Sequence, residues 1–135
     1  MVDQKIQILA TVEAMTQAFN NGDIDAVMRT YEPCAAVVAQ PGVLVTGPAA
    51  LRAMFANFVA AKAHFTFHGH EVLQAGDLAV HLTPWHMTGV GPDGSAIASA
   101  GLSVAVLRRQ PNGGWLMVID NPFGDTLLNA TSEHR

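Results

Sequence analysis

Hydrophobic residues at the start of the chain recur at helical spacing. Between Asp3 and about Phe19, apolar positions follow steps of four, three and four residues and mark one face of a helix: Ile8, Val12, Met15 and Phe19. Asp3 is a suitable N-cap, and Gly22 is a suitable stop signal because glycine commonly follows the last residue of a helix. The pattern predicts a first helix over about residues 3–19.

A second, shorter helix is predicted after Asp23. Its apolar side consists of Ile24, Val27, Met28 and Tyr31. Pro33 is expected to end this helix, because proline cannot continue it. The apolar run at residues 34–39 then predicts a short buried strand, and the turn dipeptide Pro41-Gly42 links it to a returning strand at residues 43–45.

Gly47-Pro48 predicts the start of a third helix, since proline suits the first helical position. Its apolar stripe consists of Leu51, Met54, Phe55, Phe58 and Val59. After Lys62 the spacing changes to two residues, the period of a strand. Long strands are predicted at residues 64–74, 78–88, 95–108 and 115–121, separated by turn clusters at residues 76–77, 91–94 and 111–114.

This order of elements predicts an α+β fold. The last four strands are joined by links too short for parallel crossovers, so we expect them to be antiparallel neighbours. A sheet of about six strands must bury one face against the three helices. Because no repeat or linker divides the chain, residues 1–135 are expected to form a single domain, with a core at about residues 4–125 and a tail at residues 126–135.

The composition argues against several classes of protein. Seven Lys and Arg residues against 11 Asp and Glu give a net charge of −4, so no nucleic-acid partner is expected. No uncharged apolar run reaches the roughly 18–20 residues that span a bilayer, so no membrane partner is expected. The single cysteine, Cys34, gives no disulfide framework, and the charges of the first 20 residues do not fit a signal peptide. We therefore expect a cytoplasmic protein.

Low charge also suggests a partner subunit. Only 13% of the residues are charged, against roughly 25% in an ordinary soluble domain. The strand predicted at residues 95–108 is rich in small residues that allow another sheet face to approach closely: Ala96, Ala98, Ser99, Ala100 and Gly101. We expect a homodimer that forms through the sheet.

Five of the six histidines fall in the first long predicted hairpin. A two-residue turn at Gly76-Asp77 sets its register: Ala75 opposite Leu78, Val72 opposite His81, His70 opposite Thr83 and His68 opposite Trp85. Alternation then gives one polar face: His64, Thr66, His68, His70, His81, Thr83 and Trp85. The other face is the expected core face: Phe65, Phe67, Leu73, Val80 and Leu82, with Glu71 and His86 as its polar members.

The histidines of the polar face allow more than one interpretation. His68 and His70 lie on the same side of a strand, and His81 could approach from the next strand, as in three-histidine zinc or iron sites. No carboxylate lies on that face, so a polar sheet surface, exposed or facing a partner subunit, is the main interpretation. A metal site and a pocket lined by these imidazoles are the alternatives, and we assign no metal.

Four sequence patches, in this order, carry a resemblance to a known family: residues 18–26 (AFNNGDIDA), 47–51 (GPAAL), 76–80 (GDLAV) and 113–121 (GGWLMVIDN). The chain resembles the nuclear transport factor 2-like superfamily, in particular its SnoaL-like (polyketide-cyclase-like) branch, over about residues 6–125. The resemblance implies a cystatin-like α+β roll, in which a cone-shaped, strongly curved, antiparallel or mixed sheet surrounds a pocket closed by helices. It also implies a homodimer and no metal, but no single chemistry, because members include isomerases, dehydratases, cyclases, epoxide hydrolases and non-catalytic domains.

The family architecture suggests candidate pocket residues. It places the end of the second helix, and with it Tyr31, near the pocket mouth, where the phenol could donate to a ligand oxygen. The alternative is that Tyr31 is an amphipathic aromatic residue at the edge of the core. The expected aromatic wall consists of Phe55, Phe58, Phe65 and Phe67, with Trp85 as either wall or interface anchor. Asp120 and Asn121 alternate, so only one of them enters the pocket: Asn121 if Trp115, Met117 and Ile119 face inward, and Asp120 in the other register. The alternative is that this stretch only forms the turn by which the chain leaves the last strand.

Two functions fit these residues. The first is binding of a small hydrophobic or aromatic molecule, with polar contacts from a few of Tyr31, Glu71, His86, Trp85, Asp120 and Asn121. The second is an isomerase, dehydratase or cyclase that needs no cofactor and moves a proton next to a carbonyl. Its base would be Glu71 or Asp120, and its donor Tyr31 or His86. An assembly module with a vestigial pocket is a third class.

Overall fold

The computed structural model describes residues 3–128 of the chain, so the last seven residues of the predicted tail lie outside the described part. Its elements follow in the order α1 (Gln4–Asn20), α2 (Ile24–Met28), β1 (Tyr31–Gln40), β2 (Val43–Thr46), α3 (Pro48–Ala60), β3 (His64–Phe67), β4 (Glu71–Ala75), β5 (Leu78–Val90), β6 (Ala96–Arg109) and β7 (Trp115–Asn121). The predicted α+β class is confirmed.

The helices begin where the sequence predicts. The Asp3 side chain accepts a hydrogen bond from the Lys5 backbone N–H at 2.9 Å, and the Asp23 side chain accepts one from that of Ala26 at 3.1 Å. Pro48 occupies the first turn of α3. These caps satisfy backbone N–H groups that have no partner inside the helix, which explains why the sequence signals are reliable here.

The second helix is shorter than predicted. α2 ends at Met28, the Thr30 hydroxyl donates to the Val27 carbonyl at 2.7 Å, and β1 begins at Tyr31. Such a side-chain hydrogen bond gives the backbone an alternative to another helical turn. Pro33 therefore does not end the helix. It lies inside β1, where the pairing with β7 shifts register.

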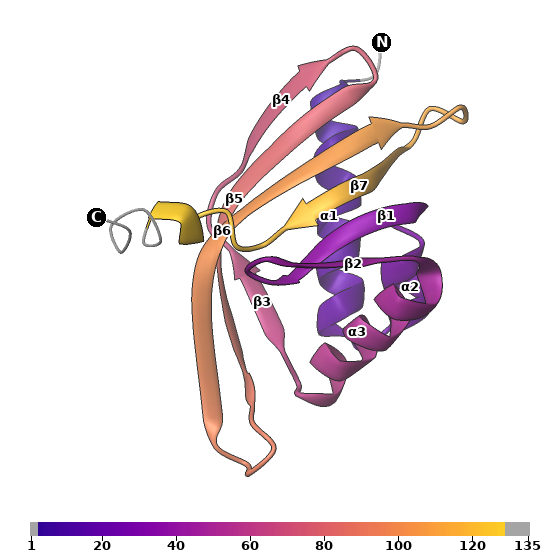
Figure 1. Cartoon of the computed structure of the whole chain (residues 1–135). Helices are drawn as coiled ribbons and strands as arrows, with labels where there is room; N and C mark the ends of the chain where they lie inside the picture. The colour runs from indigo at the N-terminus through magenta and orange to yellow at the C-terminus, as the bar shows by residue number, and fades with distance from the viewer. Residues whose placement is uncertain (1–2, 129–135) are drawn as a thin grey trace.

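Seven strands form one mixed sheet in the order β2-β1-β7-β6-β5-β3, and β4 also pairs with β5. The β1–β7 pair is parallel, and the other neighbours are antiparallel. The long strands β5 and β6 curve, and the three helices lie together on one side of the sheet (Figure 1). The predicted curved mixed sheet on three helices is confirmed, with seven strands in place of about six.

The extra strand arises from a break at Gly69. Ala75 pairs with Leu78, as predicted, but three residues (68–70) then lie opposite two (83–84), and Phe67 pairs with Trp85. Gly69 has a φ of +88°, which favours glycine. The predicted pairing of His68 with Trp85 is therefore wrong by one residue, and the predicted pairing of His70 with Thr83 is absent from the ladder.

This one-residue shift reverses the faces predicted for the hairpin. Phe65 and Phe67 share a face with Trp85, not with His86. The buried face of β5 contains Ala79, His81, Thr83 and Trp85. Leu73, predicted in the core, is 55% exposed, and Glu71 and His86 are exposed. The interpretation of Glu71 and His86 as polar members of the core face is wrong.

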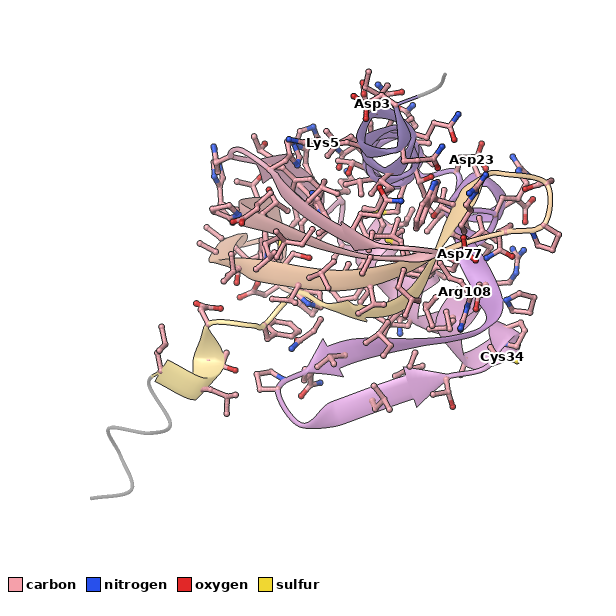
Figure 2. All side chains as sticks on the ribbon, turned by 90° about the horizontal axis from the view of Figure 1, so that it is seen from above. Asp3, Lys5, Asp23, Cys34, Asp77 and Arg108 are labelled. Carbon is pink, nitrogen blue, oxygen red and sulfur yellow. The ribbon has the colours of Figure 1, made fainter. Side chains whose placement is uncertain are left out.

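The core lies between the helices and the inner sheet face, where Ile8, Leu51 and Leu107 are fully buried. Figure 2, seen from above, looks along the axis of α1, which lies to one side of the sheet with Asp3 and Lys5 at its near end. Cys34 is exposed on β1 rather than buried among its alanine neighbours. None of the helices in residues 3–128 is long and apolar enough to cross a membrane.

One end of β6 is exposed and uncharged. Residues 96–100 are all exposed, and Ala98 and Ala100 pair with Thr88 and His86. These four residues share the outer face of the sheet, and none of them is Asp, Glu, Lys or Arg. This surface is compatible with close approach of the same face of a second copy.

We predict that the protein is a dimer at micromolar concentration in sedimentation velocity. Ala98→Lys should shift the distribution towards monomer, because it places a charge in the predicted interface. Ala53→Lys, at an exposed position of α3, should leave the dimer intact. A wild-type protein that sediments as a monomer would contradict the prediction.

Candidate functional site

A cavity of about 170 Å³ lies between the helices and the inner face of the sheet. Side chains from α1, α3 and five strands (β1, β3, β5, β6 and β7) line it. Its helical wall consists of Met15, Thr16, Phe19, Met54, Phe55 and Phe58. Its lining is predominantly apolar, as is usual for pockets that hold small molecules.

Aromatic rings form much of the wall. Phe19 meets Phe65 edge-on at 5.2 Å between ring centroids, and Phe65 lies 5.3 Å from Trp85. Tyr31 lies 5.3 Å from Phe55. Contacts of this kind add to the energy of burial and fix the ring positions, so the wall is well defined.

A buried tyrosine–aspartate pair lies at the polar end of the cavity. The Tyr31 hydroxyl donates to Oδ2 of Asp120 at 2.6 Å, and the two residues are 4% and 7% exposed. Tyr31 comes from the start of β1, and Asp120 from the end of β7, the strand paired with it. Ser103 of β6 is a second side-chain hydrogen-bond partner of Asp120.

Asp120 faces the cavity because β7 contains a bulge. Leu107 pairs with Met117, but Val106 pairs with Ile119, so Val118 is an extra residue. A bulge reverses the alternation of the side chains that follow it. Trp115 and Met117 therefore face inward before the bulge and Asp120 faces inward after it, whereas Ile119 is 45% exposed.

The environment shifts the pKa values of both members of the pair. Burial raises the pKa of the Asp120 carboxyl above its usual range, and the hydrogen bonds from Tyr31 and Ser103 oppose that rise. Burial, together with the neighbouring Asp120, raises the pKa of the Tyr31 phenol well above its usual value. The cavity thus holds a carboxyl that retains its proton to a higher pH than an exposed aspartate does.

The chain after β7 closes one end of the cavity. The Trp85 indole N–H donates to the Pro122 carbonyl at 2.8 Å, and the Phe123 ring lies 6.4 Å from the Trp85 ring. The Gly124 backbone N–H donates to the Leu102 carbonyl at 2.8 Å. Pro122 and Phe123 line the cavity, so this turn is part of its wall.

Comparison with known families agrees with this geometry. A family model described as the SnoaL-like domain matches residues 12–115, which is most of the chain. This protein belongs to the SnoaL-like domain family. The comparison with curated proteins finds no match.

Solved structures with the same fold include proteins that are described as NTF2-like. A ketosteroid isomerase-like protein from Erwinia carotovora atroseptica is 21% identical, with a TM-score of 0.79 over 90% of this chain and 95% of that one. A proposed dehydratase of the NTF2-like family from Streptomyces avermitilis is 18% identical, with a TM-score of 0.74 over 85% and 91%. A protein with a cystatin-like fold from Caulobacter vibrioides is 15% identical, with a TM-score of 0.77 over 97% and 98%. At these identities the likeness shows the fold alone.

The SnoaL-like domain brings together some of the candidate residues and separates others. Those that line its cavity are Tyr31, Phe55, Phe58, Phe65, Phe67, Trp85 and Asp120. Glu71, His86 and Asn121 do not line it. The Asn121 side-chain oxygen instead accepts from the Phe123 backbone N–H at 3.0 Å, as in a turn.

Several lining residues of this SnoaL-like domain are not among the sequence candidates. Met15, Phe19 and Met54 lie on the predicted apolar stripes of α1 and α3, so helical spacing could have indicated them. Ser103 and Phe123 are different, because their position depends on how β6, β7 and the final turn pack. No local sequence signal identifies them.

The histidines form two separate pairs in the SnoaL-like domain. His68 and His86 stack on each other and contact through Nε2 and Nδ1, whereas Nδ1 of His70 lies 2.9 Å from Nε2 of His81. Within residues 3–128, no three His, Cys, Asp or Glu residues are close enough to hold a metal ion. Burial, with His70 nearby, lowers the pKa of His81 to about 4, so His81 is neutral at pH 7.

The raised pKa of Asp120 predicts a pH-dependent difference in stability between wild type and Asp120→Asn. Because the folded state holds this proton more tightly than the unfolded state, ionisation of Asp120 destabilises the fold. The free energy of unfolding of wild type, relative to the variant, should fall as pH rises from about 3.8 through the raised pKa. Urea denaturation between pH 3 and 8 measures this difference. Tyr31→Phe keeps the carboxyl and should extend the fall to higher pH. A difference that increases with pH would contradict the prediction.

Proposed function

We propose that this SnoaL-like domain binds a small, mainly apolar molecule in the cavity between its helices and sheet. The observation that carries the proposal is an aromatic cavity with a single carboxyl among its described lining residues, at one end. A dry cavity of about 150 Å³ in another protein binds benzene, so a volume of about 170 Å³ fits a single ring. Apolar burial would supply most of the affinity.

The structural neighbours support a small organic ligand. One is named ketosteroid isomerase-like and another is a proposed dehydratase, and both names refer to chemistry on small organic molecules. In this chain the cavity lies between α1, α3 and the curved sheet, with Asp120 and Tyr31 as its buried hydrogen-bonding pair.

Ligands of one-ring size should stabilise the fold. A ligand at 100 times its dissociation constant adds about 2.7 kcal/mol to the free energy of unfolding. Thermal unfolding with toluene, phenol and benzyl alcohol would measure this stabilisation. Ala39 lines the cavity, so Ala39→Phe should fill part of the cavity and abolish the shift in unfolding temperature. Ala53→Phe, the same change at an exposed position of α3, should keep it. No shift with any of the three compounds would contradict the proposal.

A second candidate function is proton transfer without a cofactor, as in an isomerase or a dehydratase. The specific observation in its favour is Asp120, the carboxyl that lines the cavity and whose pKa is raised by burial. It would remove a proton from the carbon next to a carbonyl and return it to another position. Tyr31 donates its hydrogen to Asp120, so it would position this base rather than bind the substrate oxygen.

Deuterium exchange separates this candidate from simple binding. Wild type in D₂O should accelerate exchange of the methyl protons of acetophenone, which proton NMR measures. Exchange reports proton abstraction by the base directly, because it does not require release of a product. Asp120→Asn should slow the exchange by about 10²-fold or more, the usual contribution of a general base. Tyr31→Phe retains the base and should keep most of the rate. Equal rates in wild type and Asp120→Asn would exclude Asp120 as the base.

A further inference from the structure

The polar end of the cavity offers hydrogen-bond acceptors. The Tyr31 hydroxyl directs its hydrogen at Oδ2 of Asp120, and Ser103 is the second side-chain partner of the same carboxyl. An ionised carboxylate only accepts, so the hydrogens of both hydroxyls are already used by Asp120. The free hydrogen-bonding capacity of this cluster therefore consists of lone pairs on the three side chains.

No positive charge accompanies this carboxyl in the cavity. Among the described residues that line it, none is Lys, Arg or His. The Arg108 guanidinium, for example, is bound to Glu32 on the exposed side of the fold. An anionic ligand would therefore be buried beside Asp120 without a counter-charge, which is costly in an apolar environment.

A purely apolar ligand would also fit this end poorly. It would cover the remaining acceptor capacity of Asp120 and exclude water from it, and an unsatisfied buried acceptor costs about 1–3 kcal/mol. A hydroxyl avoids that cost in either protonation state. It donates to the carboxylate, or it accepts from the carboxyl when Asp120 holds a proton.

We propose that the cavity selects neutral one-ring molecules that carry a hydroxyl, which hydrogen-bonds to Asp120. This inference rests on the proposed binding function and specifies its ligand class. The ring occupies the space among the phenylalanines and Trp85, and the hydroxyl lies at the Tyr31–Asp120–Ser103 cluster. Carboxylates and phosphates of the same size are rejected.

Two matched pairs of compounds test this selectivity by calorimetric titration at pH 7. Benzyl alcohol and benzoate are similar in size, but only benzyl alcohol is neutral and carries a hydroxyl, so wild type should bind benzyl alcohol at least tenfold more tightly. Phenol and toluene differ by a hydroxyl in place of a methyl. Asp120→Leu should reduce the affinity for phenol, relative to that for toluene, by tenfold or more. Asp25→Leu, the same change at an exposed position of α2, should leave both ratios unchanged.

The outcomes distinguish this inference from the binding proposal that it refines. Benzoate binding as tightly as benzyl alcohol, or a phenol-to-toluene ratio unaffected by Asp120→Leu, would overturn the selectivity for neutral hydroxyl-bearing ligands while leaving the cavity a binding site. Failure of all four compounds to bind wild type would overturn the binding proposal itself. If Asp120→Leu does not fold, the comparison of benzyl alcohol with benzoate in wild type still tests the proposal, because equal affinities would overturn it.

Discussion

A carboxyl buried in an apolar environment must find hydrogen-bond partners, and this constraint organises the centre of the molecule. Asp120 lies on β7, between β1 and β6 in the sheet, and each neighbouring strand supplies one hydroxyl to it. Three strands thus converge on one side chain. The parallel β1–β7 pairing, the bulge at Val118 and the start of β1 at Tyr31 all contribute to this convergence.

Much of the fold could be predicted from the sequence, because its signals are local. Asp3 and Asp23 cap helices, Pro48 opens one, and Gly76-Asp77 sets the register of the strands beside it. Each of these residues acts through its own backbone or its immediate neighbours. Sequence spacing is therefore sufficient to locate these helix starts and this turn.

The site could be predicted only in part, because it depends on two single-residue irregularities. The break at Gly69 and the bulge at Val118 each reverse the alternation of the strand that follows. As a result the phenylalanines of β3 join Trp85 at the cavity, and Asp120 rather than Asn121 faces it. Strand periodicity left Asp120 and Asn121 as alternatives, and it placed Glu71 and His86 in the core although both are exposed. The reason is that a strict two-residue period assumes a strand without inserted residues.

The turn that walls the cavity depends on Gly124. A Cβ atom built there would meet Cγ2 of Val104 at 2.7 Å and the Leu102 carbonyl oxygen at 3.0 Å, closer than packed atoms approach. A single methyl group would push the turn away from β6 and carry the neighbouring Phe123 with it. Access to the interior from this side is thus governed by a position that has no side chain and is not itself among the lining residues.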